Sequence, residues 1–188
     1  MNQPELIDRI KNGDRTVFKD IVELWQKMVY NTALSIVQLD VDAEDITQDV
    51  FIEVYEKING FKGASLLSTW IYRITVNKAL DFEKKKKRQK NGGLLKQIFA
   101  VKEIDEPVNF NHPGVLLDNK EKAAILFKAL KKLPENQRVA FTLHKVEGLP
   151  YQEIAEIMET SLYSVESLMA RAKIGLKKML EQFYQSQA

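Results

Sequence analysis

A run of cations between residues 84 and 90 is the most concentrated chemistry in this chain. The run holds six basic and no acidic side chains, in the order Lys84, Lys85, Lys86, Lys87, Arg88, Gln89 and Lys90. Clustered cations can bind nucleic-acid phosphates, because each neutralised phosphate releases condensed counterions. The same cations could instead form a solvated helix end, where the helix dipole stabilises positive charge. The run by itself leaves both interpretations open.

Aromatic and amide side chains that precede the cationic run favour the nucleic-acid interpretation. Single-stranded bases bind by stacking on aromatic rings beside a cationic track. The residues that could do this are Phe61, Trp70, Tyr72, Asn77 and Phe82. Trp70 on its own is better explained as a core residue. Taken together with the cations, however, the set predicts a surface for single-stranded nucleic acid.

A second candidate surface is acidic, with an aliphatic residue at its centre. On the helix expected after Asp42, the face opposite the apolar stripe carries Asp45, Gln48, Asp49, Ile52 and Glu56. Ordinary solvation would account for the carboxylates but would not require an isoleucine among them. Protein interfaces combine an apolar centre with a polar rim. This face is therefore predicted to dock against a basic partner helix.

The C-terminal tract has the pattern of a helix-turn-helix. Helices are expected at 151–158 and at roughly 162–182, separated by only three residues. Ile154, Ala155 and Met158 form the inward face of the first helix, and Val165 anchors the second. The outward residues that could meet a DNA major groove are Ser161, Tyr163, Ser164, Glu166 and Ser167, with Met169 and Ala170 at the margin and Arg171 and Lys173 nearer phosphate. Helical hairpins also occur without nucleic acid, so this pattern alone does not decide.

The elements that must hold these surfaces are helices. Apolar residues recur with helical spacing along most of the chain, and no segment alternates convincingly as a strand would. Asp14, Asp42 and Ser68 each stand where the N-cap of a long helix is expected. After Asp42 the apolar residues fall four apart, at Ile46, Val50, Val54 and Ile58. Three such helices predict a compact N-terminal domain over residues 1–90.

Residues 91–117 are expected to form a flexible linker, because glycine, proline and asparagine interrupt any regular pattern. A helix should open at Asp118, which has capping-box spacing with Glu121, and Pro134 should be the first residue of the next helix, which Gly148 ends. The C-terminal domain then covers residues 118–188. The predicted fold is all-α, with two small helical domains joined by a flexible linker, the C-terminal one a helix-turn-helix.

Charge is segregated along the 188 residues, although the formal net charge is only +2. By count of acidic and basic residues, the net charge is −5 over residues 1–83, +6 over 84–90, −2 over 91–118 and +3 over 119–188. Such asymmetry favours more than one partner surface, one of them for nucleic acid.

Several kinds of chemistry lack the residues that they need. The chain has no cysteine and only two histidines, His112 and His144, which are too few ligands for a typical zinc site. No glycine-rich phosphate loop, metal-ligand motif or nucleophile–base pair is present, so we expect no enzyme, no cofactor and no metal. No apolar run of bilayer length and no signal-peptide pattern occurs. A cytoplasmic protein is predicted.

Two groups of motifs together resemble one known family. The N-terminal motifs are Asp42-Ala-Glu-Asp-Ile-Thr-Gln-Asp-Val-Phe51, Phe61-Lys-Gly63 and Ser68-Thr-Trp-Ile-Tyr-Arg-Ile74, followed by Asn77 and Asp81. The C-terminal motifs are Leu133-Pro-Glu-Asn-Gln-Arg138, Glu147-Gly-Leu-Pro-Tyr-Gln-Glu-Ile-Ala155, Ser164-Val165 and Arg171-Ala-Lys173. In this order and spacing they resemble the two domains of bacterial RNA polymerase sigma factors of the sigma-70 superfamily, and most closely the extracytoplasmic-function (ECF) type.

The resemblance implies a transcription initiation factor without catalytic activity, which binds core RNA polymerase and promoter DNA. It implies docking on the polymerase by Asp45, Gln48, Asp49 and Ile52. It implies melting and reading of the −10 element, including capture of a flipped base, by Phe61, Lys62, Trp70, Tyr72, Arg73, Asn77, Lys84, Lys85, Lys86, Lys87 and Arg88. It implies reading of the −35 element by Ser161, Tyr163, Ser164, Glu166, Ser167, Arg171 and Lys173. An anti-sigma factor is expected as a further partner.

The reading helix departs from the family pattern. Tyr163-Ser164-Val165-Glu166-Ser167-Leu168 stands where many members carry Gly-Thr-Val-Lys-Ser-Arg. Because glutamate accepts from cytosine instead of pairing with phosphate, −35 specificity cannot be transferred from other members. The alternative function is a stand-alone helix-turn-helix regulator whose N-terminal helices oligomerise. Such a regulator would need neither the acidic helix face nor the melting loop.

Overall fold

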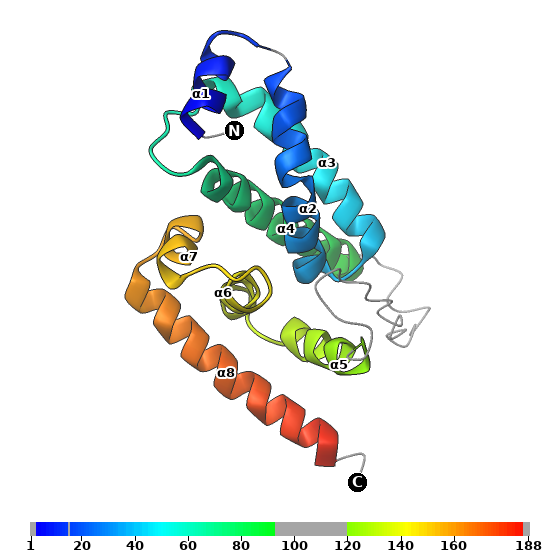
Figure 1. Ribbon diagram of the computed structural model, residues 1–188. Coiled ribbons are helices and arrows are strands. Elements are labelled where there is room, and N and C mark those ends of the chain that lie inside the picture. Colours follow the sequence, from blue (N-terminus) through cyan, green and yellow to red (C-terminus); the bar gives the residue numbers. More distant parts are fainter. Residues whose placement is uncertain (1–2, 15, 93–119, 186–188) are drawn as a thin grey trace.

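The computed structural model describes residues 3–14, 16–92 and 120–185, and all regular structure within these ranges is helical. The elements are α1 (Gln3–Lys11), α2 (Val17–Val37), α3 (Asp40–Lys57), the short 3-10 helix η1 (Ile58–Gly60), α4 (Leu67–Gly92), α5 (Lys120–Lys131), α6 (Glu135–Lys145), α7 (Tyr151–Ile157) and α8 (Leu162–Gln185) (Figure 1). The all-α prediction is confirmed. Of the predicted linker, residues 91–92 still belong to α4, and residues 93–117 lie outside the described ranges.

Helices α2, α3 and α4 pack together as an N-terminal unit. The apolar residues spaced four apart on α3 form the predicted buried stripe, with Val50 and Val54 fully buried and Ile46 2% exposed. They meet buried residues of the neighbouring helices such as Ile21 and Ile71. Burying one side chain of this size stabilises a fold by about 1.5–3 kcal/mol. This stripe therefore holds α3 in place.

The N-termini of these helices differ from the predicted caps. The Asp14 carboxylate accepts a hydrogen bond from the Thr16 N–H at 2.9 Å, which makes a turn before α2 while Thr16 occupies the N-cap position. Helix α3 begins at Asp40, so Asp42 lies inside its first turn, and α4 begins at Leu67, one residue before Ser68. The Asp42 carboxylate instead pairs with Lys86 of α4 at 2.6 Å. A tertiary ion pair has replaced the expected local cap.

Gln38 ends α2 in the left-handed backbone conformation, with φ of 60°. Its N–H donates to the Leu34 carbonyl at 2.8 Å, which is a common way to satisfy the end of a helix. Because the chain turns sharply at Gln38, only Leu39 separates this residue from α3, which folds back along α2. The Gln38 side chain extends toward α5, where Nε2 donates to the Phe127 carbonyl at 2.8 Å.

Helices α5 to α8 form a C-terminal unit in which α8 packs against α5, α6 and α7. Leu143, Ile154 and Val165 are fully buried in it. Pro134 is the N-cap of α6 and not its first residue, and α8 extends three residues beyond the predicted end at 182. Gly148 follows α6 with φ of +75°, a conformation that strains other residues. The predicted cap at Asp118 lies outside the described residues.

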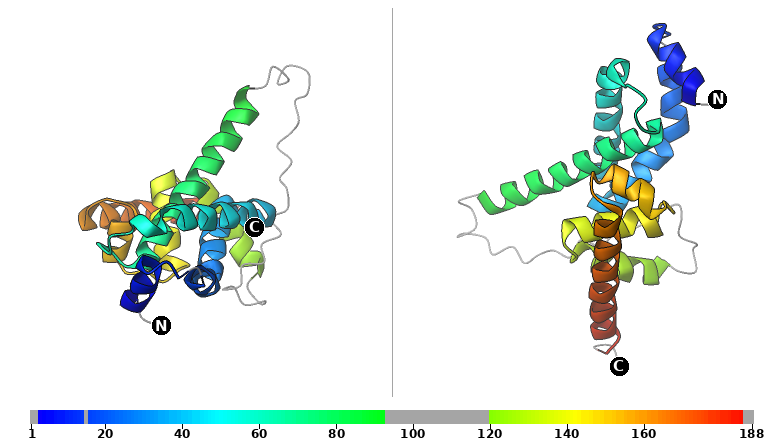
Figure 2. Two further views of the ribbon diagram at one scale, coloured as in Figure 1. Left: turned by 90° about the horizontal axis from the view of Figure 1, so that it is seen from above. Right: turned by 90° about the vertical axis from the view of Figure 1, so that its left-hand side faces the viewer.

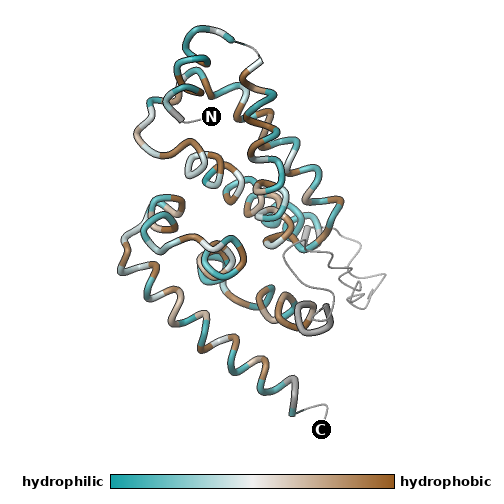
Figure 3. Tube along the Cα trace, viewed as in Figure 1, coloured by the Kyte–Doolittle hydropathy of each residue, from teal (hydrophilic) through white to brown (hydrophobic). Residues whose placement is uncertain are grey.

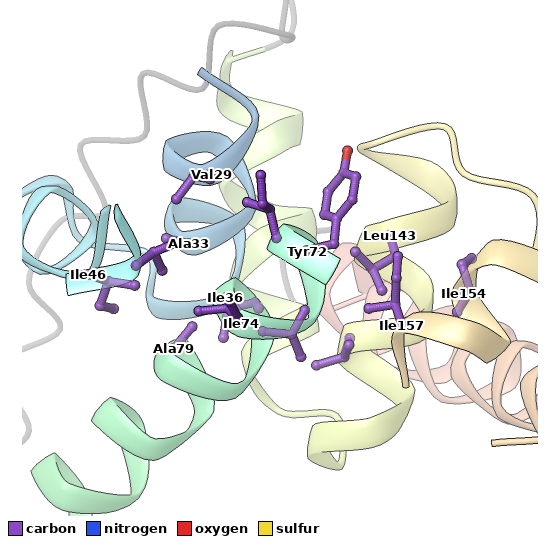
Figure 4. Close-up of a cluster of buried hydrophobic side chains, with 14 of the residues drawn as sticks. Val29, Ala33, Ile36, Ile46, Tyr72, Ile74, Ala79, Leu143, Ile154 and Ile157 are labelled. Atoms are coloured by element: carbon purple, nitrogen blue, oxygen red, sulfur yellow. The ribbon is translucent and has the colours of Figure 1, made fainter. Parts of the chain in front are cut away.

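The two units pack against each other. Helix α2 contacts α6, and α4 contacts α7. Their buried apolar side chains form one continuous cluster, in which Tyr72 of α4 lies near Leu143 of α6, with Ile157 of α7 beside them (Figure 4). Helical periodicity predicts the inward faces of each unit but carries no information about this joint, because the joint residues are far apart in sequence.

Helix α4 has a free end and α8 a free face. The last turns of α4 project beyond the packed body (Figure 2). Along α8 hydrophobic and hydrophilic residues alternate, as expected for a helix with one packed and one exposed face (Figure 3). Among the helices of the described residues, none combines the length and the hydropathy required to cross a membrane.

Candidate nucleic-acid and protein interfaces

The start of α4 and the loop before it bring the predicted aromatic residues together. The rings of Phe61 and Trp70 lie with their centroids 5.3 Å apart, and both side chains are partly buried. Lys62 and Asn77 are exposed. Trp70 thus packs at the edge of the core, as its structural interpretation required, and part of it stays accessible to a ligand.

The cationic run forms the exposed end of α4, and three of its members already have acidic partners. Lys85, Lys87 and Arg88 are exposed. Lys84 and Lys87 lie 3.9 Å and 3.8 Å from the Glu135 carboxylate at the start of α6. Exposed ion pairs of this kind contribute about 0–1 kcal/mol. The two lysines can therefore exchange Glu135 for a phosphate at little cost.

Two of the residues predicted to read the −10 element face the C-terminal unit. Tyr72 is 7% exposed, and burial, reinforced by the Glu147 carboxylate, raises the pKa of its hydroxyl well above the usual value. Arg73 Nη1 lies 3.0 Å from Glu159 Oε1, and Nη2 donates to the Glu156 carbonyl at 2.7 Å. In this arrangement Tyr72 is buried, whereas the Arg73 side chain contacts α7 and the turn after it but stays 30% exposed.

Glu147 lies at the junction of the two units. Burial raises the pKa of its carboxyl to about 7, although the nearby hydroxyls of Tyr72 and Thr32 act in the opposite direction. Its Oε1 is shielded from solvent and has no hydrogen-bond partner among the described residues. A carboxyl with such a pKa is substantially protonated near neutral pH. No sequence pattern signals this, because the burial comes from α2 and α4.

Helix α3 presents the predicted docking face to solvent. Asp45, Gln48 and Asp49 are exposed, and Ile52 is 56% exposed. Tyr55, three residues after Ile52, is 57% exposed and adds a second apolar side chain that sequence reasoning missed. Exposed apolar residues within a rim of carboxylates suit a protein partner better than solvent.

The flank of this face is stabilised by ion pairs to Glu53. Its carboxylate binds Lys57 at 2.7 Å and Lys78 of α4 at 3.0 Å. The hydrogen bond from Lys57 is the largest cause of its lowered pKa. The ion pair with Lys78 connects α3, which carries the acidic face, to α4, which carries the cationic run. The two candidate surfaces therefore lie on neighbouring helices in direct contact.

Helices α7 and α8 form the predicted helix-turn-helix. Ala155 is 4% exposed and Val165 is fully buried, as expected for the crossing of the two helices. Ser161 Oγ accepts the Ser164 N–H at 3.1 Å and so caps α8. Glu159 takes a left-handed conformation in the turn, with φ of 51°, without the glycine that this conformation favours.

The outward face of α8 carries most of the residues predicted to contact DNA. Tyr163 is 79% exposed, and Glu166, Arg171 and Lys173 are exposed as well. Arg171 Nη2 donates to Ser167 Oγ at 2.6 Å. Met169 is 1% exposed, so its predicted place at the margin of this face is wrong. It lies four residues after Val165 and belongs to the same buried stripe.

The residues that join the two units were not predicted as functional. Glu83 and Arg138 form an ion pair in which the residues are 8% and 2% exposed. Glu83 follows the fully buried Ala79 by one helical turn, and this spacing was the available signal that it points inward. The six cations between residues 84 and 90 follow it directly in the sequence. Across the described ranges, no group of three or more potential metal ligands comes together.

Comparison with known proteins agrees with this geometry. A family model described as Sigma-70 region 2 matches residues 21–89, which cover α2 to α4, and one described as Sigma-70 region 4 matches residues 123–174, which include the helix-turn-helix. The ECF RNA polymerase sigma-E factor of Escherichia coli is 32% identical over 184 residues, covering 94% of this chain and 93% of the relative. The chain belongs to the sigma-70 family of RNA polymerase sigma factors, and within it to the ECF type.

Another relative and two solved structures extend the comparison. The RNA polymerase sigma-H factor of Pseudomonas aeruginosa is 29% identical over 185 residues, covering 94% of this chain and 93% of the relative. The fold matches the sigma factor RpoE of Bartonella quintana, solved with the anti-sigma factor NepR, at a TM-score of 0.66, with 24% identity and coverage of 87% and 96%. It also matches CnrH, solved with the cytosolic domain of CnrY, at a TM-score of 0.69, with 19% identity and coverage of 96% and 97%.

Proposed function

We propose that this chain directs core RNA polymerase to particular promoters, docking on the enzyme through α3 and engaging promoter DNA through α4 and α8. One observation carries the proposal: α3 exposes an apolar centre with carboxylates around it, and the adjoining α4 exposes a cationic end. A subunit that brings DNA to an enzyme needs one face that docks on protein and another that binds phosphate. Here the two faces lie on helices that the Glu53–Lys78 ion pair joins. Core polymerase supplies the catalysis.

For the −10 element, α4 and the loop before it supply stacking and phosphate contacts. Trp70 and Phe61 offer ring surface, Asn77 offers an exposed amide, and the end of α4 offers cations. Extruding a base from a duplex costs a few kcal/mol, which such contacts can repay. Arg73 is partly accessible already, whereas Tyr72 joins this surface only when the C-terminal unit moves away from it.

For the −35 element, α8 is the reading helix. Its first turns expose Tyr163 and Glu166, and Arg171 lies one turn further, where a phosphate contact fits. With Glu166 outward, this helix offers fewer cations to phosphate than many relatives do. We infer that base and shape contacts carry more of its selectivity.

An anti-sigma factor is a further proposed partner. The support is that both solved neighbours were determined as complexes, RpoE with an anti-sigma factor and CnrH with the cytosolic domain of CnrY.

Run-off transcription with core polymerase tests the proposed function. Core enzyme alone, the protein alone and the two together are assayed on a library of promoters. A sequence-selective transcript that needs both components supports the proposal. Sequence-specific footprints from the protein alone, with no effect on transcription by the core enzyme, would favour the stand-alone regulator.

A further inference from the structure

Lys86 differs from other cations of the run in what its ammonium group contacts. Its Nζ lies 2.6 Å from Asp42 Oδ2 of α3, which is the distance of a charge-assisted hydrogen bond. Lys84 and Lys87 lie 3.9 Å and 3.8 Å from the Glu135 carboxylate, beyond hydrogen-bond reach. Of these three ion pairs, only the pair with Asp42 is a hydrogen bond.

The position of Lys86 on α4 continues the packed side of the helix. Ala79 is fully buried and Phe82 packs against the core, and steps of three and four residues bring Lys86 onto the same stripe. The Lys86 Nζ lies 5.9 Å from the centroid of the Phe82 ring, within the range of a cation–π contact. The ammonium group is therefore held by contacts within the protein on two sides.

Asp42 makes the exchange of this ion pair costly. Its side chain is 14% exposed, whereas that of Glu135 is 34% exposed. If a DNA phosphate took Lys86, the largely shielded Asp42 carboxylate would lose its cation and lie near another negative charge. Removing one partner of a shielded pair is destabilising, whereas exposed pairs exchange at little cost. Phosphates are therefore expected at the other cations of the run.

A second ion pair ties the same two helices together. Lys78 of α4 lies 3.0 Å from Glu53 of α3, and it precedes Lys86 by eight residues, or about 12 Å, along α4. Lys78 follows Asn77, the exposed amide that the proposed function assigns to the −10 element. Two ties at this separation fix the register of α4 on α3 and the direction of its cationic end.

We propose that Lys86 is a positioning residue for −10 recognition and not a phosphate ligand. Paired with Asp42, it anchors the end of α4 to the start of α3 and so aims the exposed cations on either side of it at the DNA. This inference rests on the proposed function for the identity of the ligand. It divides the cationic run into one lysine that orients the helix and neighbours that bind phosphate.

The two roles of Lys86 predict opposite effects of one substitution. Asp42→Asn removes the anchor, so a positioning role predicts that promoter binding weakens about fivefold, the upper range for an accessible ion pair. A phosphate-binding role predicts tighter binding, because the substitution frees Lys86 and removes a negative charge. Binding is measured for the protein assembled with core polymerase, on a forked fragment of a promoter that the run-off assay selects. Core enzyme is saturated with each variant, because Asp42 lies one turn before the docking residue Asp45.

Asp81→Asn is the matched control. It removes the same charge from the same region, but the Asp81 side chain is 79% exposed and lies 3.8 Å from Lys84. Freed from this loose pair, Lys84 should bind DNA as tightly as in the parent or slightly more tightly. Weaker binding by Asp42→Asn and not by Asp81→Asn would support the positioning role, and tighter binding by Asp42→Asn would overturn it.

A charge swap provides the rescue. Asp42→Lys combined with Lys86→Asp restores the pair with the cation on α3, and should recover most of the affinity that Lys86→Asp alone loses. Asp81→Lys combined with Lys86→Asp has the same net charge without the pair and should not recover it. Equal affinities of these two double variants would overturn the proposal, because charge alone would then explain the binding.

Hydrogen exchange tests the anchor without polymerase or DNA. Amides from Lys84 to Gln89 should exchange about fivefold faster in Asp42→Asn and in Lys86→Met than in the parent, since an untied helix end opens more often. Asp81→Asn should exchange at the parental rate. Unchanged exchange in both anchor variants would overturn the anchor. Faster exchange without promoter binding by any assembly, including that of the parent, would leave the anchor standing and refute the DNA ligand together with the proposed function.

Discussion

Ionisable residues in this protein behave differently at the joint than at the surface. Glu83 and Arg138 are buried and Glu147 is half-buried with one carboxylate oxygen shielded from solvent, whereas Glu166 and Asp45 face water. A shielded carboxyl such as Glu147 keeps its proton because the charged form loses hydration. An exposed one acts on whatever ligand approaches it.

At Glu147 the consequence is a stability that depends on pH. Its pKa is about 7 in the folded protein, against a usual value of 4.5. Between these values the folded state holds a proton that the unfolded state has lost, so stability falls as pH rises, by at most about 1.4 kcal/mol per unit. Below 4.5 and above about 7 this contribution is constant. Glu147→Gln has no proton to lose at this position and should therefore abolish this contribution to the pH dependence of stability.

Denaturant unfolding at pH 5, 6, 7 and 8 measures this effect. The quantity to compare at each pH is the difference in free energy of unfolding between the parent and Glu147→Gln. The free energy of unfolding of Glu147→Gln should rise steadily relative to that of the parent as the pH increases to 7. A difference that is flat with pH would mean that the carboxyl is hydrated in the folded protein.

At Glu166 the consequence is for DNA affinity. Glu166→Lys should tighten binding to −35 duplexes of any sequence and steepen the salt dependence by about one phosphate contact. Glu181→Lys, near the other end of α8 with its side chain 58% exposed, is the matched charge control. Titrations of native and scrambled duplexes at several salt concentrations provide the measurement.

A different outcome at Glu166 would identify another role. Weakening of the native site alone, by roughly 1–3 kcal/mol, would show that the carboxylate accepts a hydrogen bond from a cytosine. No change in affinity or salt slope would show that this side of α8 does not face DNA.

At the scale of elements, α3 separates its two jobs onto two faces. One face buries Ile46, Val50 and Val54, and the other exposes Asp45, Asp49 and Ile52. Substitutions on the outer face can therefore change docking without creating a cavity. This separation makes the docking proposal testable in a folded protein.

Asp45→Lys combined with Asp49→Lys should abolish binding to core polymerase and leave the fold intact. The reversed charges would repel the basic helix that the face is proposed to meet. Glu23→Lys with Glu181→Lys adds the same charge at exposed positions away from the face and should bind normally. Pull-down with core enzyme at moderate salt measures this. Equal affinity of the two double variants would remove the docking assignment.

Helix α4 combines packing and melting in neighbouring residues. Asn77→Ala removes an exposed amide and should slow open-complex formation on duplex promoters more than on templates already opened at −10. Trp70→Ala should do the same but should also destabilise the domain, by up to about 3–5 kcal/mol, since Trp70 packs on Phe61. Permanganate footprinting on both templates gives the measurement. Equal losses on both would indicate a defect in base reading or docking.

At the scale of the whole molecule, the shared core couples the two units. Because apolar side chains of both units form one cluster, the parent should unfold in a single calorimetric transition. Glu83→Lys should split it into two, since each unit keeps its own core when the joint opens. Asp81→Lys should retain one transition. A parent that already shows two transitions would mean that the joint contributes little to stability.

The sequence by itself determined the helices, the inward stripes and the chemical character of the surfaces. Apolar residues four apart predicted the buried stripe of α3, and the short separation of two helices predicted the α7–α8 turn, because both patterns are local. Helix caps were less predictable. Asp42 had the residue type of a cap, but α3 begins two residues earlier, at Asp40, and the Asp42 carboxylate pairs with Lys86 of another helix.

Only the tertiary structure decided what lies between the units. Glu83, Arg138 and Glu147 are charged residue types that usually face water, and nothing local distinguishes them from neighbours that do. Their burial depends on helices that approach from more than 50 residues away, as the 55-residue separation of the Glu83–Arg138 pair illustrates. Tyr72 is likewise buried at the joint, and Arg73 is partly covered there. Sequence periodicity reports how one helix meets its own core, whereas the joint depends on how two cores meet.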